Sequence, residues 1–551
     1  PDNANFWGYN QTYGLGFFEY FQFAEDLGAE PLPVVPAGVN GCGLNFQASG
    51  DDLQPWIDNA LDLIEFANGG VDTEWGAVRA DMGHPEPFDL KYLGIGNEES
   101  DPLFYENYPR FAAAITAEHP DIQLISNSGP QSAGGVFERS WAFAREQGAD
   151  LVDEHYYNSP LWFLSNNDRY DDYDRAGPHV FIGEYASQGD TWFNALAEAS
   201  YMTGIERNAD VVDFASYAPL LSRIGHNQWF PNLIWYDNDE VYGTASYEVQ
   251  RLFARNAGDT VVPSTLDAEP LPGPGPIRGG VGLASWATQV AYDDVVVTDA
   301  DGDVLLKDDF SGDASQWDAQ TGQWEVADGE YVQSSDATDA RAVAGDPSWT
   351  DYDLEVTARK LGGAEGFLVM FGVQDTGNWY WWNLGGFGNT YSLVERAVNG
   401  GKTPMATTDH TIETGRDYRI RIEVRGRQVS LSLDGELVQR FTDDVGQVEP
   451  LYHVATSDRR TGDVVVKVVN ARPEAVRTAV AVDGVRPRSA AQVTTLTAPS
   501  RSTVNSLGDP DAVAPRTTRL RLGDDFTYDF PADSVTFIRM DADRRRGRHR
   551  R

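Results

Sequence analysis

Residues 16–245 alternate between short apolar runs that end in polar residues and longer segments with a helical spacing of apolar residues. This rhythm is typical of βα units around a parallel sheet. The strand candidates are residues 30–38, 91–99, 121–129, 150–157, 179–186 and 210–218. The helix candidates are residues 53–67, 108–119, 136–148 and 191–208. The first part of the chain is therefore predicted to be an α/β domain.

From about residue 275 the pattern changes to a period of two, with Gly and Asp turns and few helical stretches. Such a pattern predicts stacked antiparallel sheets. DYDLEVTARKL (351–361) and NWYWWNL (378–384) indicate one jelly-roll-like sandwich, and the stretch from GDVVVKVVN (462–470) to SVTFIRM (534–540) indicates a second β region. The sequence thus predicts an α/β part followed by all-β parts.

Two short motifs in the β part have a structural and a ligand-binding interpretation. Among Trp379, Tyr380, Trp381 and Trp382, alternation places only one parity outward, so core packing is preferred to a sugar-stacking platform. DADGD (299–303) lacks the Gly spacing and terminal Glu of an EF-hand loop, so a hairpin turn is preferred to a calcium site.

Residue parity predicts which acids reach the mouth of a parallel barrel, where catalytic groups lie at the carboxyl ends of strands. In KYLGIGNEE, Leu93 and Ile95 share the parity of Asn97 and Glu99, and the glycines share the parity of Glu98. The large aliphatic residues belong against the helices, so Glu98 is predicted to face the interior. Glu99 is predicted to be a structural or solvated neighbour.

The same alternation in HVFIGEYA groups Glu184 with Val180 and Ile182 and leaves this second glutamate at the mouth. Two carboxyls that flank a bond are the minimal equipment for glycoside hydrolysis. Asn97 is suited to hold a substrate hydroxyl, and His155 and Tyr157 to orient Glu184. The alternative for each single Glu is a solvated loop residue, which an acidic chain supplies often.

The charge balance limits the class of partner. The chain has 85 acidic and 42 basic residues, of which five are lysines, and a formal net charge of −43. Such a field repels polyanions, which excludes a nucleic-acid partner. An acidic, lysine-poor composition fits a halophilic protein, because concentrated salt screens its self-repulsion. No apolar run is long enough to span a membrane, and the single cysteine, Cys42, excludes a thiolate zinc cluster.

Several motifs together resemble the α-L-arabinofuranosidases of glycoside hydrolase family 51. They are YLGIGNEES, LVDEHYYNSP, NNDRYDDYDRAGPHVFIGEYAS and NLIWYDNDEVYGTASYEVQ, followed near the C-terminus by KVVNARPEA and TVNSLGDPDAVAP. The resemblance implies a retaining enzyme with a clan A (β/α)8 TIM barrel and no metal or organic cofactor. Glu98 on strand four is then the acid/base and Glu184 on strand seven the nucleophile. Asn97, His155, Tyr157 and Gln228 match substrate-contacting positions.

Counting back from these glutamates makes residues 30–38 the third barrel strand, so the barrel is expected to lack its first two βα units. Residues 277–447 resemble a laminin-G-like or concanavalin-like sandwich inserted in the C-terminal β-sandwich. The expected domains are the incomplete barrel (1–245), the start of the C-terminal sandwich with a linker (246–276), the insertion (277–447), the rest of the C-terminal sandwich (448–541) and a basic tail (542–551).

The resulting prediction is the removal of terminal, non-reducing α-L-arabinofuranosyl residues from arabinan- or arabinoxylan-type polysaccharides or oligosaccharides. An endo-acting β-glucanase or xylanase on the same barrel stays open, as does a carbohydrate-binding protein without catalysis. The first residues, PDNANFWGYNQT, are not a signal peptide, so an export signal is absent or already removed. An extracellular location is expected, with the cytoplasm as the alternative, and no oligomeric state is predicted.

Overall fold

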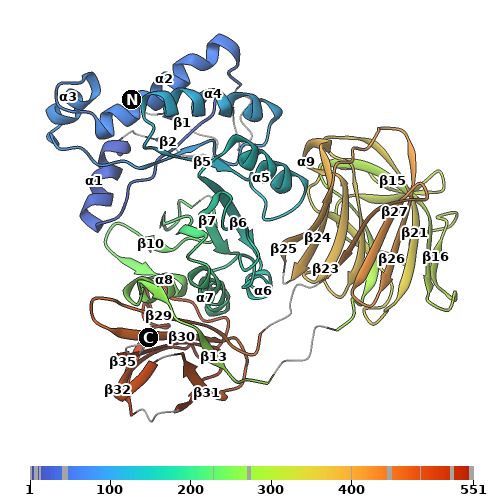
Figure 1. Ribbon diagram of the computed structural model, residues 1–551. Coiled ribbons are helices and arrows are strands. Elements are labelled where there is room, and N and C mark those ends of the chain that lie inside the picture. Colours follow the sequence, from blue (N-terminus) through green and yellow to red (C-terminus); the bar gives the residue numbers. More distant parts are fainter. Residues whose placement is uncertain are drawn as a thin grey trace, which may run out of the picture.

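The computed structural model describes residues 3–4, 10–11, 14–39, 47–227, 229–269, 275–398, 400–443, 449–483, 485–521 and 526–544 (Figure 1). Cys42, Gln228 and most of the basic tail lie outside these residues. A two-stranded hairpin, β1 (Asn3–Ala4) and β2 (Asn10–Gln11), precedes the first helix. None of the helices in these ranges is long and apolar enough to cross a membrane.

A six-stranded parallel sheet forms the centre of the N-terminal part, and its strands follow one another in chain order. They are β3 (Val34–Val35), β4 (Tyr92–Ile95), β5 (Gln123–Asn127), β6 (Leu151–Asn158), β7 (His179–Ser187) and β8 (Val212–Tyr217). All six predicted strands are thereby confirmed. β3 and β8 are the two outer strands of this sheet.

One helix precedes the sheet and the others follow its strands, and helices cover one face of the sheet (Figure 1). They are α1 (Phe17–Leu27), a 3₁₀ turn η1 (Gly50–Leu53), α2 (Gln54–Asn68), α3 (Glu74–Asp81), α4 (Pro102–Glu118), α5 (Gly135–Gln147), α6 (Pro160–Ser165), α7 (Trp192–Arg207) and α8 (Ala245–Arg255). The four predicted helices correspond to α2, α4, α5 and α7. Side chains at helix starts fix several of them: Asp101 accepts a hydrogen bond from the Leu103 N–H, and Thr191 accepts one from the Asn194 N–H.

Leu93 and Ile95 belong to the apolar core between sheet and helices, as their parity predicts. The opposite face of the sheet carries a smaller apolar cluster of Ile125, Leu151 and Phe181. Between β8 and α8 lies a small sheet of β9 (Leu221–Arg223), β10 (Ile234–Tyr236) and β11 (Val241–Gly243).

The C-terminal part has a six-stranded and a three-stranded sheet around a common apolar core. The first contains β12 (Thr260–Val261), β29 (Tyr452–Ser457), β30 (Asp463–Asn470), β35 (Ser534–Arg544), β32 (Val485–Leu496) and β33 (Arg516–Leu520). The second contains β13 (Ser264–Leu266), β31 (Val476–Val482) and β34 (Phe526–Phe530). α7 packs on β29 and β30, where the buried Lys467 forms an ion pair with Glu206.

Between β13 and β29 the chain forms a separate sandwich of two antiparallel sheets. The seven-stranded sheet contains β17 (Asp318–Thr321), β20 (Ala340–Ala344), β14 (Gly280–Ser285), β22 (Phe367–Val373), β23 (Trp379–Gly385), β24 (Tyr391–Val398) and β25 (Gly401–Thr408), with the short α9 (Gly386–Asn389). The eight-stranded sheet contains β18 (Trp324–Ala327), β19 (Glu330–Gln333), β15 (Thr288–Asp299), β16 (Val304–Asp308), β21 (Tyr352–Gly363), β26 (Asp417–Arg425), β27 (Gln428–Leu433) and β28 (Glu436–Thr442). The laminin-G-like assignment and the domain boundaries stay predictions.

The two motifs of the β part have structural roles. Tyr380 and Trp382 lie in the core between the two sheets, and Trp379 and Trp381 pack on the other face of β23; all four are buried. Core packing is therefore confirmed. DADGD forms the turn of the β15–β16 hairpin, where Asp299 accepts hydrogen bonds from backbone N–H groups of the turn.

The sandwich lies beside the parallel sheet, with β24 and β25 on the near side (Figure 1). Ser159, which follows β6, forms a buried hydrogen bond of 2.8 Å with Thr403 on β25. The Gly135 N–H donates to Thr407 Oγ1 at 2.9 Å. Both contacts involve loops that follow the carboxyl ends of β5 and β6, so the sandwich adjoins the edge at which barrel sites lie.

Candidate active site

Glu98 follows β4 on a turn with unusual backbone angles. The strand ends at Ile95, and Gly96 and Glu98 have φ values of +85° and +55°. A Cβ at position 96 would lie 2.7 Å from the Phe104 ring, so glycine is required there for two reasons. A non-glycine residue in the left-handed region is strained, and such strain concentrates at functional sites. A turn, and not strand alternation alone, therefore directs the Glu98 side chain.

Glu184 is placed by a β-bulge in β7. Asp153 pairs with Phe181 and His155 pairs with Glu184, so β7 has one more residue than β6 between these two pairs. The same irregularity appears against β8, between Ile182 and Tyr185. A bulge shifts the alternation by one residue and redirects the side chains after it.

This bulge corrects the predicted grouping of Glu184. Val180 and Ile182 are fully buried in the core on the helix side, whereas Glu184 faces the imidazole of His155. The assumption of regular alternation through HVFIGEYA was wrong. Glu184 nevertheless lies on the same side of the sheet as Glu98, in the second half of β7, because the bulge adds one residue before it.

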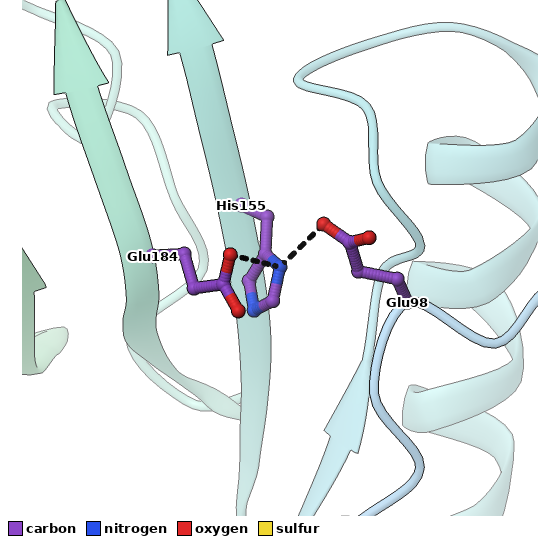
Figure 2. A group of neighbouring side chains, drawn as sticks. All are labelled: Glu98, His155 and Glu184. Carbon is purple, nitrogen blue, oxygen red and sulfur yellow. Dashed lines mark hydrogen bonds and ion pairs between the residues drawn. The ribbon is translucent and has the colours of Figure 1, made fainter. Parts of the chain in front are cut away.

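His155 lies between the two glutamates (Figure 2). Its Nδ1 is 2.8 Å from Glu98 Oε1 and 3.6 Å from Glu184 Oε2. One carboxylate oxygen of each glutamate and one ring nitrogen lie within 4.8 Å of one another. Side-chain exposure is 3% for His155, 18% for Glu98 and 32% for Glu184, so the site is sheltered but open to solvent at the glutamates.

Tyr157 contacts the second glutamate. Its hydroxyl donates a hydrogen bond of 2.7 Å to Glu184 Oε2, as expected for a residue that orients Glu184. His155, for which the same role was expected, makes its closer contact with Glu98. The ring of Trp229 packs edge-on against Tyr157, with centroids 5.0 Å apart, and extends the wall of the site.

Asn97 and Gln228 complete the predicted set. Asn97 is half-buried directly before Glu98, on the same turn. Gln228 lies outside the described residues, next to Trp229. No prediction was made for Asp153, which is 4% exposed and contacts both His155 and the bulge of β7. Its position two residues before His155 on the same strand was the available signal.

The electrostatics of the site are dominated by the three carboxylates around His155. Burial lowers the pKa of His155, but Asp153, Glu98 and Glu184 outweigh this effect and raise it well above the ordinary value. Burial raises the pKa of Glu184, and His155 and the Tyr157 hydrogen bond oppose that rise. The raised pKa favours the protonated form of the His155 ring.

Glu99 differs from a solvated neighbour. It is 2% exposed, and its Oε1 accepts a hydrogen bond of 3.2 Å from the Ala37 N–H after β3. Burial raises its pKa to about 8. Glu99 thus connects the loops after β3 and β4 and has a structural role.

Carboxylate and imidazole groups of this kind also bind divalent ions. In this structure the His155 Nδ1 lies 2.8 Å from Glu98 Oε1, and its Nε2 lies 3.2 Å from Asp153 Oδ2. Both ring nitrogens are occupied by carboxylates of the site, so we assign no metal site to these residues.

Paired carboxylates at the carboxyl-end edge of a parallel barrel sheet define the arrangement found in barrel glycosidases. Residues 1–175 match the model of the alpha-L-arabinofuranosidase 1 domain, and residues 179–534 match the model of the alpha-L-arabinofuranosidase C-terminal domain. The chain belongs to the α-L-arabinofuranosidases of glycoside hydrolase family 51.

Individual relatives agree with this membership. An extracellular exo-alpha-L-arabinofuranosidase of Streptomyces chartreusis is 57% identical over 543 residues, which are 98% of this chain and 65% of the relative. An arabinose-bound family 51 α-L-arabinofuranosidase aligns with a TM-score of 0.59 and 23% identity over 98% of this chain and 60% of its own. An α-L-arabinofuranosidase from Thermotoga maritima, in complex with arabinose, aligns with a TM-score of 0.54 and 15% identity. The alignment covers 98% of this chain and 81% of the Thermotoga chain.

These structural likenesses support a TIM-barrel fold with an attached sheet domain. The chain spans 65% of the length of the Streptomyces relative and 60% of the first solved structure.

Proposed function

We propose that the protein is a retaining exo-glycosidase that removes terminal, non-reducing α-L-arabinofuranosyl residues. The observation that carries this proposal is the pair Glu98 and Glu184, with carboxylate oxygens within 4.8 Å of each other at the edge of the parallel sheet. Retaining enzymes hold their two carboxyls about 5–5.5 Å apart, whereas inverting enzymes need about 6.5–9.5 Å for a water molecule. The short separation supports a covalent, two-step reaction.

In the first step Glu184 attacks the anomeric carbon, and the bond to the leaving oxygen breaks as Glu98 gives that oxygen its proton. In the second step Glu98 takes a proton from water, the water oxygen bonds to the anomeric carbon, and the bond to Glu184 breaks. Tyr157 supports the first step because its hydrogen bond favours the ionised form of Glu184. The Nδ1 of His155 lies 2.8 Å from Oε1 of Glu98, and this contact keeps the Glu98 side chain directed at the site.

We also propose which residues near Glu98 and Glu184 contact the substrate, which polymers supply it and where the protein acts. Asn97, His155, Tyr157 and Gln228 are proposed to contact the sugar, and arabinan- or arabinoxylan-type chains or oligosaccharides are the proposed source. An extracellular location is proposed because the Streptomyces relative is an extracellular enzyme.

Glu98→Ala and Glu184→Ala test the two roles. Both variants should lose about 10²-fold or more of wild-type kcat/KM on a phenyl α-L-arabinofuranoside. Azide should restore turnover in both variants, and the configuration of the arabinofuranosyl azide should tell the two roles apart. Glu98→Ala should give the α-azide, and Glu184→Ala should give the β-azide. Glu106→Ala, an exposed residue of α4, is the control and should keep wild-type activity. Near wild-type hydrolysis by Glu184→Ala would remove the proposed nucleophile.

Product analysis separates the remaining alternatives. An exo-arabinofuranosidase releases arabinose alone from arabinan and from feruloyl-free arabinoxylan. Oligomers as first products would instead favour an endo-acting glucanase or xylanase. Binding of these polymers without any hydrolysis by the wild-type protein would favour a carbohydrate-binding protein.

A further inference from the structure

Asp153 is a buried carboxylate whose two oxygens contact two different parts of the site. Its Oδ1 accepts a hydrogen bond of 2.9 Å from the Gly183 N–H, and its Oδ2 lies 3.2 Å from Nε2 of His155. The residue is 4% exposed. A buried carboxylate is costly unless such contacts compensate it. We infer that Asp153 is a positioning residue that orients His155 toward Glu98 and fixes the bulge that directs Glu184.

The contact with Gly183 explains how the bulge keeps its shape. A Cβ at position 183 would lie 2.2 Å from Asp153 Oδ1, so the carboxylate occupies the space that any other residue would need. Gly183 and Glu184 lie on the same side of β7 because the bulge adds a residue there. The hydrogen bond from the Gly183 N–H therefore fixes the residue directly before the proposed nucleophile.

The contact with His155 determines which ring nitrogen faces the glutamates. With Nε2 held by Asp153, Nδ1 points at Glu98 and lies near Glu184 (Figure 2). The charged groups around the ring are Asp153 from β6, Glu98 from the turn after β4, and Glu184 from β7. Three carboxylates favour a ring protonated on both nitrogens. Asp153 thereby maintains the Nδ1–H donor at Glu98 without touching the substrate.

This inference rests on the proposed function, because Glu98 is taken as the proton donor to the leaving group. Asp153→Asn keeps an oxygen that can accept from Gly183 but removes the negative charge beside His155. Gly183→Ala keeps the charge but displaces the carboxylate. The matched control is Asp213→Asn: Asp213 on β8 lies 2.9 Å from Nδ1 of His179 on β7, a second Asp–His pair of the same sheet away from the glutamates.

The assay compares leaving groups. Hydrolysis of phenyl α-L-arabinofuranoside requires protonation of the leaving oxygen. Hydrolysis of the 2,4-dinitrophenyl compound requires it little, because dinitrophenolate is a good leaving group. Asp153→Asn should lower kcat/KM about 10-fold or more on the phenyl substrate and much less on the dinitrophenyl substrate. The alkaline limb of its pH profile should move to lower pH, because the imidazolium loses its proton more easily without Asp153. Gly183→Ala should lower activity on both substrates, since it moves the bulge as well.

A measurement that does not depend on catalysis separates a failure of the proposed function from a failure of the role inferred for Asp153. The imidazole NMR signals of His155, assigned by their loss in His155→Ala, should titrate at lower pH in Asp153→Asn than in the wild type and be unchanged in Asp213→Asn. If the wild type hydrolyses neither aryl arabinofuranoside, the proposed function fails, and this titration still decides the role of Asp153. The inference is overturned if His155 titrates alike in Asp153→Asn and the wild type. It is also overturned if Asp153→Asn loses activity equally on both substrates with an unchanged pH profile.

Discussion

The hydroxyl of Tyr157 donates a hydrogen bond of 2.7 Å to Oε2 of Glu184. The two residues come from neighbouring parallel strands, and the bulge in β7 brings Glu184 to the side on which Tyr157 lies. Hydrogen bonds to a charged acceptor are worth about 1.5–3 kcal/mol. This contact is therefore large enough to influence the ionisation of Glu184.

Tyr157→Phe should lower kcat/KM about 10-fold or more, since each 1.4 kcal/mol corresponds to a factor of ten. Burial raises the pKa of Glu184 and the Tyr157 hydrogen bond lowers it, so the variant should have a still higher pKa at Glu184. Because a nucleophile must be ionised, the acidic limb of the pH profile of kcat/KM should move to higher pH. Tyr156→Phe, which loses a hydroxyl on the helix side of the same strand, is the control. An acidic limb that stays in place in Tyr157→Phe would contradict this account.

Glu99→Gln should change how thermal stability depends on pH. Burial raises the pKa of Glu99 from 4.5 to about 8, so the folded protein binds this proton more tightly than the unfolded chain. Stability must then fall as the pH rises from about 4.5 to about 8. The unfolding temperature of Glu99→Gln should fall less than that of the wild type over this window, and Glu106→Gln should follow the wild type. If the unfolding temperatures of Glu99→Gln and the wild type changed equally with pH, burial would not raise the pKa of Glu99 as described.

Thr403→Val tests the contact between the sandwich and the parallel sheet. The variant loses the buried hydrogen bond to Ser159, a loss of about 1 kcal/mol. The unfolding temperature measured by calorimetry should fall by about 1 °C, because the unfolding entropy of a chain of this length is about 1.2 kcal/mol/K. Thr442→Val, at an exposed position of β28, should leave it unchanged. If Thr403→Val and Thr442→Val both unfolded at the wild-type temperature, the hydrogen bond between Ser159 and Thr403 would make no measurable contribution to stability.

Salt should stabilise the protein. With a net charge of −43, its acidic groups repel one another, and molar salt shortens the screening length to about 3 Å. The unfolding temperature should therefore rise between 0.1 M and 2 M KCl. Sucrose at equal osmolality, which does not screen charges, is the control and should have a smaller effect. Equal stability in dilute and concentrated KCl would rule out the halophilic interpretation.

The sequence predicted the strands of the parallel sheet and the two glutamates because both depend on local patterns. Apolar runs ending in polar residues identify buried strands, and the carboxyl ends of parallel strands meet at one edge. The position of Glu98 and Glu184 follows from this rule even though the side-chain alternation used to support Glu184 does not hold.

What the sequence did not reveal depends on tertiary contacts. The bulge at Gly183 is visible only when β7 pairs with β6 and β8, and Asp153 gains its role only through that bulge. Glu99 was placed on the helix-facing parity but not recognised as buried, because its partner is the Ala37 N–H, 62 positions earlier in the chain. Periodicity carries no information about such pairs.

The stereochemistry of the first product tests the central claim most directly. The claim is that Glu98 and Glu184, with oxygens within 4.8 Å, act by a covalent two-step reaction. Proton NMR of the hydrolysis of an aryl α-L-arabinofuranoside, recorded before mutarotation, should show α-L-arabinofuranose first. First release of the β anomer would contradict the retaining mechanism and the role of Glu184 as nucleophile.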